Sequence, residues 1–177
     1  LTETYIARFD RVWKPVASCL DVVNVNDDLG MQDGPQISPE LFRKRIKPFM
    51  KRLYGHIRKA SGAALFLHSD GSLYDLLPDL IDAGVQIVSP VQFTCRNMDL
   101  RRLKSEFGAH LVFWGGGCDT QRILPYASPA EVRRHVRENV SILAPGGGFV
   151  FTQVHNIQPD VPPENIEAMF AAAAGAA

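Results

Sequence analysis

Short apolar runs and longer amphipathic stretches take turns along the chain, a pattern typical of strands that alternate with helices. Apolar runs rich in β-branched and aromatic residues predict five strands, over residues 21–26, 63–67, 85–88, 109–113 and the run after Gly148. Each run ends in polar residues or glycine, and a helical stretch separates it from the next run. The strands are therefore predicted to be parallel, because a strand joined to the next by a helix returns in the same direction.

The amphipathic stretches carry signals of helix ends. Ser-Pro-Glu at residues 38–40 supplies an N-cap, a proline in the first turn and an acid, and it predicts a helix that runs to about Ala60. The side chains expected to face inward on this helix are Phe42, Ile46, Phe49, Leu53 and Ile57. Upstream, residues 3–19 predict a helix that is interrupted at Pro15. Its apolar stripe comprises Ile6, Phe9, Val12, Trp13 and Val16.

Further helices are predicted over residues 72–83 and 99–107, each followed by a glycine that ends it. Another begins at the capping box Ser-Pro-Ala-Glu of residues 128–131. Val132, Val136 and Val140 form the apolar stripe of that helix.

The chain closes with a helix that follows two prolines at residues 162–163 and runs into an alanine-rich end. Residues 171–177 show no packing pattern, so we expect them to form a tail. The domain itself is predicted to span residues 1–170.

Alternating strands and helices joined by short connections predict an α/β fold, and polar residues at the strand ends favour a TIM (β/α)8 barrel. A closed barrel needs eight strands and roughly 250 residues, whereas this chain offers about five βα units. We therefore expect the C-terminal portion of a longer barrel. Its first strand would lack a neighbour, which favours a homo-oligomer. An open doubly wound sheet is the alternative fold.

The bulk composition narrows the classes of partner. Lys and Arg total 19 and so do Asp and Glu, so no charge excess points to nucleic acid or to an anionic membrane. The apolar runs are too short to cross a bilayer, and the first ten residues do not resemble a secretory signal. Three widely spaced cysteines form no disulfide framework. A cytoplasmic location is therefore the prediction.

Polar residues at the predicted strand ends are the candidates for chemistry. Asp27 and Asp28 close the first strand and are expected to act as acid or base, with His155 after the last strand as a third catalytic candidate. Asp in such a position also commonly caps a loop. Equivalent positions are predicted to bind substrate, with Trp114 as an aromatic wall, at Gln92, Trp114, Asp119, Gln121 and Gln153.

A metal site is predicted at His68, Asp70 and His155. His68 and Asp70 are two residues apart at a strand end, so both side chains point to one face of the sheet. If that face is the barrel mouth, His155 converges on them. Two histidines and a carboxylate with open positions form a known set of metal ligands. The alternative is a hydrogen bond between His68 and Asp70 without a metal ion.

Several motifs resemble those of the uroporphyrinogen decarboxylase superfamily. The most specific is the run His-Asn-Ile-Gln-Pro-Asp-Val-Pro-Pro-Glu-Asn-Ile at 155–166. Ser-Pro-Glu-Leu-Phe at 38–42, His-Ser-Asp-Gly at 68–71 and Leu-Pro at 124–125 add to it. The resemblance implies a TIM barrel that acts on tetrapyrroles. The superfamily holds the decarboxylases of haem synthesis and metal-dependent methyltransferases that work with methylated corrinoids.

The resemblance also implies roles for the predicted metal ligands. The methyltransferases build a zinc site from His-x-Cys at one strand end and a cysteine near the last strand. His68 matches the family histidine, while Asp70 stands where the first cysteine would be and His155 stands near the second. The decarboxylases carry a histidine on the last strand, which His155 also matches.

The resemblance thus implies an enzyme that performs metal-assisted methyl transfer. Its cofactors would be zinc or another divalent metal, and a corrinoid as co-substrate. Its partners would be a small-molecule or tetrapyrrole substrate and a corrinoid protein. Two alternatives stay open, namely a uroporphyrinogen decarboxylase of porphyrin biosynthesis and a non-catalytic tetrapyrrole-binding module.

Overall fold

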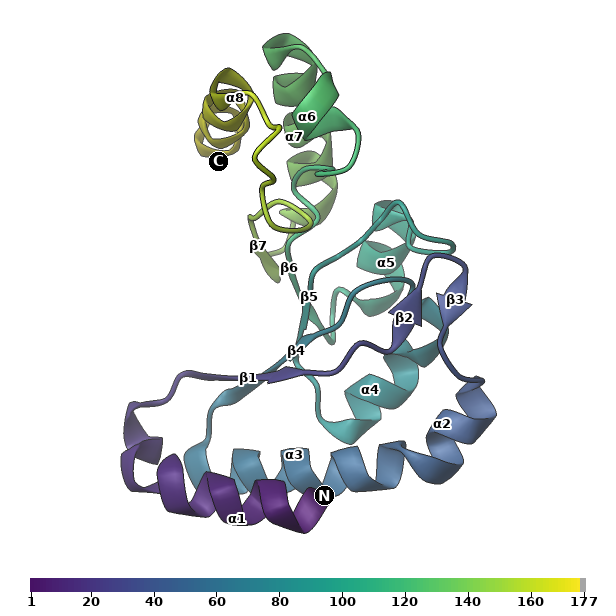
Figure 1. Cartoon of the computed structure of the whole chain (residues 1–177), viewed down its shortest axis with the longest axis vertical. Helices are drawn as coiled ribbons and strands as arrows, with labels where there is room; N and C mark the ends of the chain where they lie inside the picture. Colours follow the sequence, from purple (N-terminus) through teal and green to yellow (C-terminus); the bar gives the residue numbers. More distant parts are fainter. Residues whose placement is uncertain (176–177) are drawn as a thin grey trace.

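A computed structural model describes residues 1–175 of the chain (Figure 1). Five strands form one parallel sheet, and their order in the sheet follows their order along the chain. The strands are β1 (Val22–Asn26), β4 (Ala64–His68), β5 (Ile87–Ser89), β6 (Val112–Trp114) and β7 (Phe149–Val150). The two short strands β2 (Gly30–Met31) and β3 (Gly34–Pro35) make a separate antiparallel hairpin within the loop after β1.

Helices cover one face of this sheet, as Figure 1 shows. They are α3 (Lys47–Ser61), α4 (Leu77–Ala83), α5 (Leu100–Phe107) and α7 (Pro129–Leu143). In β4, Leu65 and Leu67 are fully buried within this layer, while Phe66 and His68 are only half-buried. Because successive side chains of a strand point to opposite faces, the His68 side chain lies on the face away from the helices.

The strand order excludes the doubly wound alternative. Such a sheet reverses its strand order at a switch point and carries helices on both faces. Here β1, β4, β5, β6 and β7 are neighbours in sequence order, without a reversal. Consecutive parallel strands with helices on one face are the arrangement of a barrel sector.

The helix predicted from residue 39 to Ala60 is two helices, α2 (Pro39–Arg45) and α3. Pro48 explains the break, because its ring clashes with the carbonyl four residues earlier and it has no N–H to donate. The break changes which side chains face inward. Phe42 and Ile57 are buried as predicted, but Phe49 is 58% exposed. Met50 and Tyr54 are buried in its place.

The N-terminal helix is also shorter than predicted. Helix α1 (Thr2–Val12) gives way to the 3-10 helix η1 (Lys14–Cys19), which contains Pro15. Of the predicted apolar stripe only Phe9 is buried. Val12, Trp13 and Val16 are nearly half exposed, so most of this stripe has no covering layer.

Helices α5 and α7 follow their predicted start signals closely, whereas the α-helix predicted over residues 72–83 begins only at Leu77. Ser128 and Glu131 form both hydrogen bonds of the capping box at the start of α7, and Asp99 caps α5. A 3-10 turn, η2 (Tyr74–Leu76), precedes α4. The four-residue helix α6 (Ile123–Tyr126) was not predicted.

The alanine-rich end packs more than its sequence suggests. Helix α8 (Pro163–Ala174) continues through the first four of these alanines, and Ala172 is 1% exposed in a cluster with Val136 and Met169. Residues 176–177 of the predicted tail lie outside the described residues. No helix of residues 1–175 is both long and apolar enough to cross a membrane.

Candidate functional site

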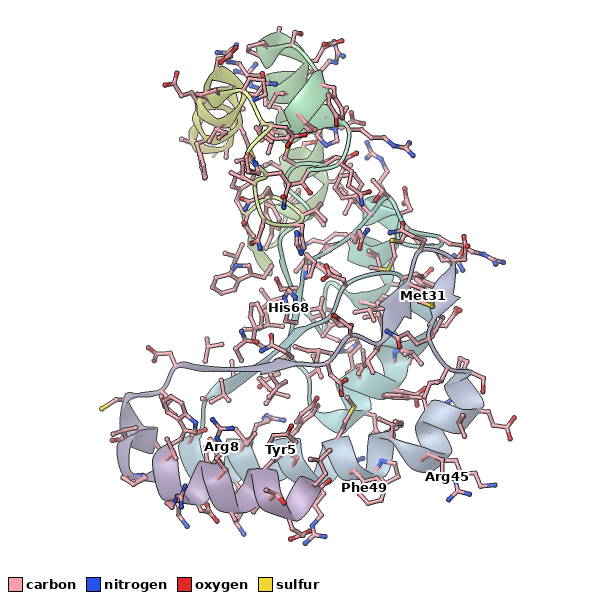
Figure 2. All side chains as sticks on the ribbon, viewed as in Figure 1. Tyr5, Arg8, Met31, Arg45, Phe49 and His68 are labelled. Atoms are coloured by element: carbon pink, nitrogen blue, oxygen red, sulfur yellow. The ribbon has the colours of Figure 1, made fainter. Side chains whose placement is uncertain are left out.

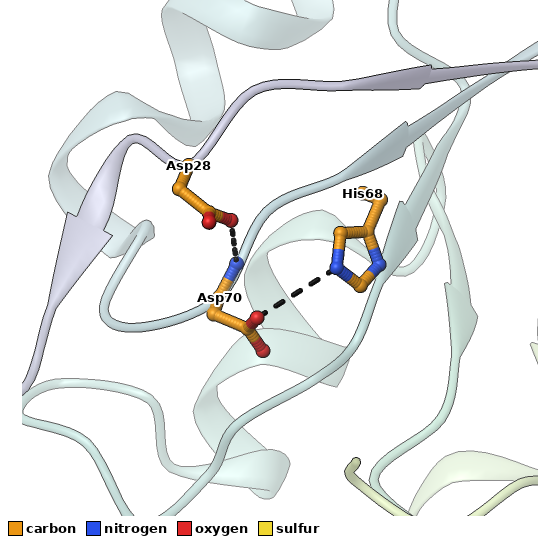
Figure 3. A group of neighbouring side chains, drawn as sticks. All are labelled: Asp28, His68 and Asp70. Carbon is orange, nitrogen blue, oxygen red and sulfur yellow. Dashed lines mark hydrogen bonds and ion pairs between the residues drawn. The ribbon is translucent and has the colours of Figure 1, made fainter. Parts of the chain in front are cut away.

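The loops that follow β1 and β4 are bound to each other at the C-terminal ends of these strands (Figure 3). The N–H of Asp70 donates a hydrogen bond of 3.1 Å to Oδ1 of Asp28. The N–H of Leu29 donates to Oγ of Ser69, a fully buried residue, at 2.9 Å. The two loops therefore hold the Asp28 and Asp70 side chains beside each other.

Two glycines allow this close approach. Gly71 has φ +85°, and a Cβ atom there would overlap the backbone of Gly30 and Met31. A Cβ atom at Gly30 would in turn lie 2.5 Å from the carbonyl oxygen of Asp70. Only glycine fits at both positions, because each backbone occupies the space where the other's side chain would begin.

The predicted metal ligands come together around the Asp70 carboxylate. Its Oδ2 lies 3.6 Å from Nε2 of His68 and 3.9 Å from Nε2 of His155. Ligand atoms of Asp28, His68 and Asp70 all lie within 4.8 Å of one another. Asp28 thus lies beside the predicted ligands, in the position from which the sequence had suggested it as an acid or base.

These distances are longer than those of direct hydrogen bonds and leave room for an ion or a water molecule between the side chains. An imidazole N–H bonded to a carboxylate lies at about 2.7–2.9 Å, well below the separations found here. Two ligands at about 2.0–2.1 Å from one tetrahedral zinc ion lie about 3.3 Å apart. The separations of His68 and His155 from Asp70 exceed that spacing by about 0.3 and 0.6 Å. The residues whose ligand atoms are all mutually close are Asp28, His68 and Asp70, and this group does not include His155. Their chemistry, imidazole and carboxylate, also fits zinc.

A cavity of about 340 Å³ opens next to this cluster. Five of its lining residues were predicted as site residues, namely Asp70, Gln92, Asp119, Gln121 and His155. The other lining residues are Thr94, Thr120, Val154, Asn156 and Gln158. Asn156 and Gln158 belong to the same polar run as His155, which is a signal that the sequence did contain. The threonines carried no such signal.

Two of the lining residues also shape the loops. Oε1 of Gln92, a buried side chain, accepts a hydrogen bond of 2.9 Å from the N–H of Gly71. Oδ1 of Asp119 accepts from the N–H groups of Gln121 at 2.7 Å and Arg122 at 3.2 Å. Asp119 is 5% exposed, so one oxygen of its carboxylate is committed to holding the loop that follows β6.

Two predicted substrate-binding residues do not line this cavity. Trp114 packs edge to face against Phe66, with ring centroids 5.4 Å apart, on the sheet face that carries His68. Oε1 of Gln153 accepts a hydrogen bond of 3.0 Å from the hydroxyl of Thr152. Both side chains of this aromatic pair are half-buried.

Asp27 lies apart from its neighbour Asp28. It lines a second, larger groove of about 1020 Å³ between β1, α1 and α3. Tyr5, Arg8 and Phe49 line this groove as well, and Figure 2 shows them away from His68. Although Asp27 is exposed overall, partial burial raises the pKa of its carboxyl group, and the charge of Asp28 raises it further.

Replacing Asp27 by asparagine tests which role this residue has. A raised folded-state pKa means that the ionised carboxylate lowers stability once the pH exceeds that pKa. The Asp27→Asn variant should therefore be at least as stable as the wild type at pH 7. The difference should disappear as the pH falls below about 4, where the wild-type carboxyl is protonated as well. Urea unfolding at both pH values measures this, and a clear loss of stability at pH 7 would make Asp27 a loop-capping residue.

Comparison with known proteins bears on the fold and the family. Among solved structures, a methyltransferase from Methanosarcina mazei aligns with a TM-score of 0.70 and 21% sequence identity. The alignment covers 98% of this chain and 47% of that chain, so this chain spans about half its length. This likeness confirms the predicted fold class. A search of curated proteins gave no match. The family model of uroporphyrinogen decarboxylase (URO-D) matches residues 16–175, and the chain therefore belongs to the uroporphyrinogen decarboxylase family.

Proposed function

We propose that this chain is the metal-binding, C-terminal part of a barrel enzyme, formed by residues 1–170, that transfers a methyl group with a corrinoid as co-substrate. A divalent ion, zinc by preference, would be held by His68, Asp70 and His155. The observation that carries the proposal is that two imidazoles, one from the end of β4 and one from the loop after β7, approach one carboxylate oxygen at 3.6 and 3.9 Å. Membership of the family and the likeness to a methyltransferase support it.

The charges of the cluster also support a cation. Asp28 and Asp70 bring carboxylate oxygens within 4.8 Å of each other, and no Lys or Arg belongs to the cluster. Like charges at such a distance repel each other unless a cation or protons compensate them. A dication balances both carboxylates and leaves each imidazole neutral, which is the form that binds metal.

Each side chain around the cluster would then have its own role in the reaction. When bound, the ion would supply Lewis acidity toward a substrate heteroatom. Gln92 and Gln121 would bind polar groups of a substrate in the 340 Å³ cavity. Asp28, exposed beside Asp70, would accept a proton from a substrate heteroatom. The half-buried Trp114 and Phe66 offer aromatic surface to a flat ligand such as a tetrapyrrole.

Metal analysis of the wild-type protein tests this proposal. Purified without chelator and offered zinc at neutral pH, the protein should hold about one ion per chain. If it holds none, methyl transfer with a metal fails. A uroporphyrinogen decarboxylase, or a tetrapyrrole-binding module without catalysis, then becomes the better assignment, with His155 bonding to a substrate carboxylate.

The open sheet supports a further expectation about association. Within residues 1–175, β1 and β7 each have one neighbour in the sheet, so each leaves one edge unpaired. Tyr5, Val22 and Phe49 expose apolar surface near the β1 edge. Because free edges and apolar patches favour association, we expect the 177-residue chain to sediment as a dimer or larger species. A concentration-independent monomer in sedimentation velocity would contradict this expectation.

A further inference from the structure

The loop that follows β6 forms one wall of the 340 Å³ cavity through Asp119, Thr120 and Gln121. On one side it is bound to the segment after β7. The N–H of Gly117 donates to the carbonyl of Thr152, and the N–H of Val154 donates to the carbonyl of Cys118, both at 2.9 Å. On the other side it is bound by two side chains of α7.

Asn139 and His135, one helical turn apart on α7, make this second attachment. Nδ2 of Asn139 donates to the carbonyl oxygens of Gly116 at 3.1 Å and Gly117 at 3.4 Å. Nε2 of His135 accepts a hydrogen bond of 3.3 Å from the N–H of Asp119. Asn139 is 5% exposed, so these bonds are made away from solvent.

The contacts of His135 determine its protonation state. A backbone N–H can only donate, so Nε2 of His135 must be the unprotonated nitrogen and Nδ1 carries the proton. Nε2 also lies 3.2 Å from Nδ2 of Asn139, so the two hydrogens of this amide are shared among His135 and the carbonyls of Gly116 and Gly117. The imidazole is therefore neutral and faces two N–H donors. Phe93 packs against the ring, with centroids 5.7 Å apart.

We propose that His135 is a positioning residue for the substrate cavity, and that its neutral ring, together with Asn139, holds the Asp119–Gln121 wall in place until protonation releases it. The inference rests on the proposed function, because that function assigns the cavity to the substrate. The hydrogen-bond partners of His135, Asp119 and Asn139, are not proposed metal ligands.

Protonation of His135 would convert its Nε2 atom from a hydrogen-bond acceptor into a donor. A hydrogen on Nε2 would face the N–H of Asp119, which would lose its acceptor inside the protein. A buried donor without a partner costs more than the hydrogen bond contributed, so the wall should move away from α7. Asp119 and its neighbours would then leave the positions that shape the cavity.

The charged groups around the ring set the pH range. Burial lowers the pKa of His135 from its ordinary value of 6.5, while the charges of Asp119 and Glu138 act in the opposite direction. Because the pKa of His135 is lowered in the folded state, the hydrogen bond that its neutral ring accepts contributes its full stability above pH 6.5. Its contribution is lost as the pH falls below that value and through the folded-state pKa.

Amide hydrogen exchange at Asp119 tests the inference, because only a bond to His135 makes this amide respond to the imidazole. The wild type is compared with His135→Phe, which removes the acceptor, and His135→Gln, which keeps an acceptor that does not titrate. Rates are measured from pH 7.5 to 4.5 and corrected for intrinsic exchange. The Asp119 amide should exchange roughly fivefold faster in His135→Phe at every pH, as expected for the loss of one neutral hydrogen bond.

The wild type should match His135→Gln above pH 6.5 and approach His135→Phe in acid. Equal pH profiles for the wild type and His135→Gln, or an unchanged Asp119 amide in His135→Phe, would overturn the inference. If His135→Phe fails to fold, the wild type and His135→Gln still decide it. Zinc content at pH 7.5 should be the same in all three proteins. If the wild type holds no zinc but exchange of its Asp119 amide still depends on the protonation of His135, the proposed function is refuted. The role of His135 in holding the wall is then unaffected.

Discussion

Replacing His155 by alanine is expected to abolish stoichiometric zinc binding, and His68→Ala should do the same. Each substitution removes one of three proposed ligands and leaves the Asp70 carboxylate with a single imidazole. Even second-shell partners of metal ligands contribute 10–100-fold to affinity, so the loss of a direct ligand should weaken binding by more than about 100-fold. Metal content after gel filtration and zinc titration measure the effect.

Variants at Asp70 separate charge from ligand type. Asp70→Asn keeps the shape and removes the negative charge, so zinc should bind more weakly. Asp70→Cys should preserve or strengthen zinc binding, because a thiolate is the softer ligand.

His110→Ala is a suitable control, since His110 is exposed where β6 begins, at the opposite end of the strand from the cluster. Acidification should weaken binding in the wild type, because protons compete with the metal for its ligands. Full zinc occupancy in His155→Ala would remove His155 from the site.

The Gly71→Ala variant should lose both stability and metal binding. Its positive φ alone costs of order 1–3 kcal/mol for a residue with a side chain, and the new methyl group would overlap the backbone of Gly30. The two loops would have to separate, which carries Asp28 away from Asp70. We expect a loss of at least about 2 kcal/mol in unfolding free energy, measured by urea denaturation, with zinc affinity falling in the same protein.

Gly55→Ala provides the matched control for that substitution. Gly55 lies inside α3, and no atom lies within 4 Å of a Cβ built there. Alanine should therefore leave zinc binding unchanged and raise stability by up to about 1 kcal/mol. If Gly71→Ala retained wild-type stability and zinc affinity, the contact between Gly30 and Gly71 would have no part in shaping the site.

Much of the fold follows from local patterns in the sequence. The capping box of α7 and the proline-led starts of α2 and α8 are short-range signals, and each helix begins where they predict. The inward face of α3 was harder to predict. Pro48 ends one helix and begins the next, so the helical period does not continue through it, and Phe49 lies outside while Met50 lies inside.

The candidate site, like the fold, could be predicted only in part from local sequence patterns. His68 and Asp70 share one face because they are two residues apart on a strand end, and this could be predicted from spacing. Asp27 and Asp28 look alike in the sequence, yet adjacent residues point to opposite sides of a strand end. Asp28 therefore joins the cluster and Asp27 lines the other groove. The hydrogen bond between the Asp28 side chain and the backbone of Asp70 joins two loops. Such a long-range contact produces no periodic pattern in a sequence.

The sequential strand order has a consequence for how the sheet assembles. Every strand of the parallel sheet pairs with the next strand of that sheet along the chain, so each step of assembly closes one crossover connection. The entropy cost of closing a loop rises with its length, and topologies rich in local contacts fold fast. The shortest connection joins β4 to β5, where Phe66 pairs with Ile87. The pair of strands that forms at the least entropic cost is therefore the one that carries His68, with Asp70 directly after it.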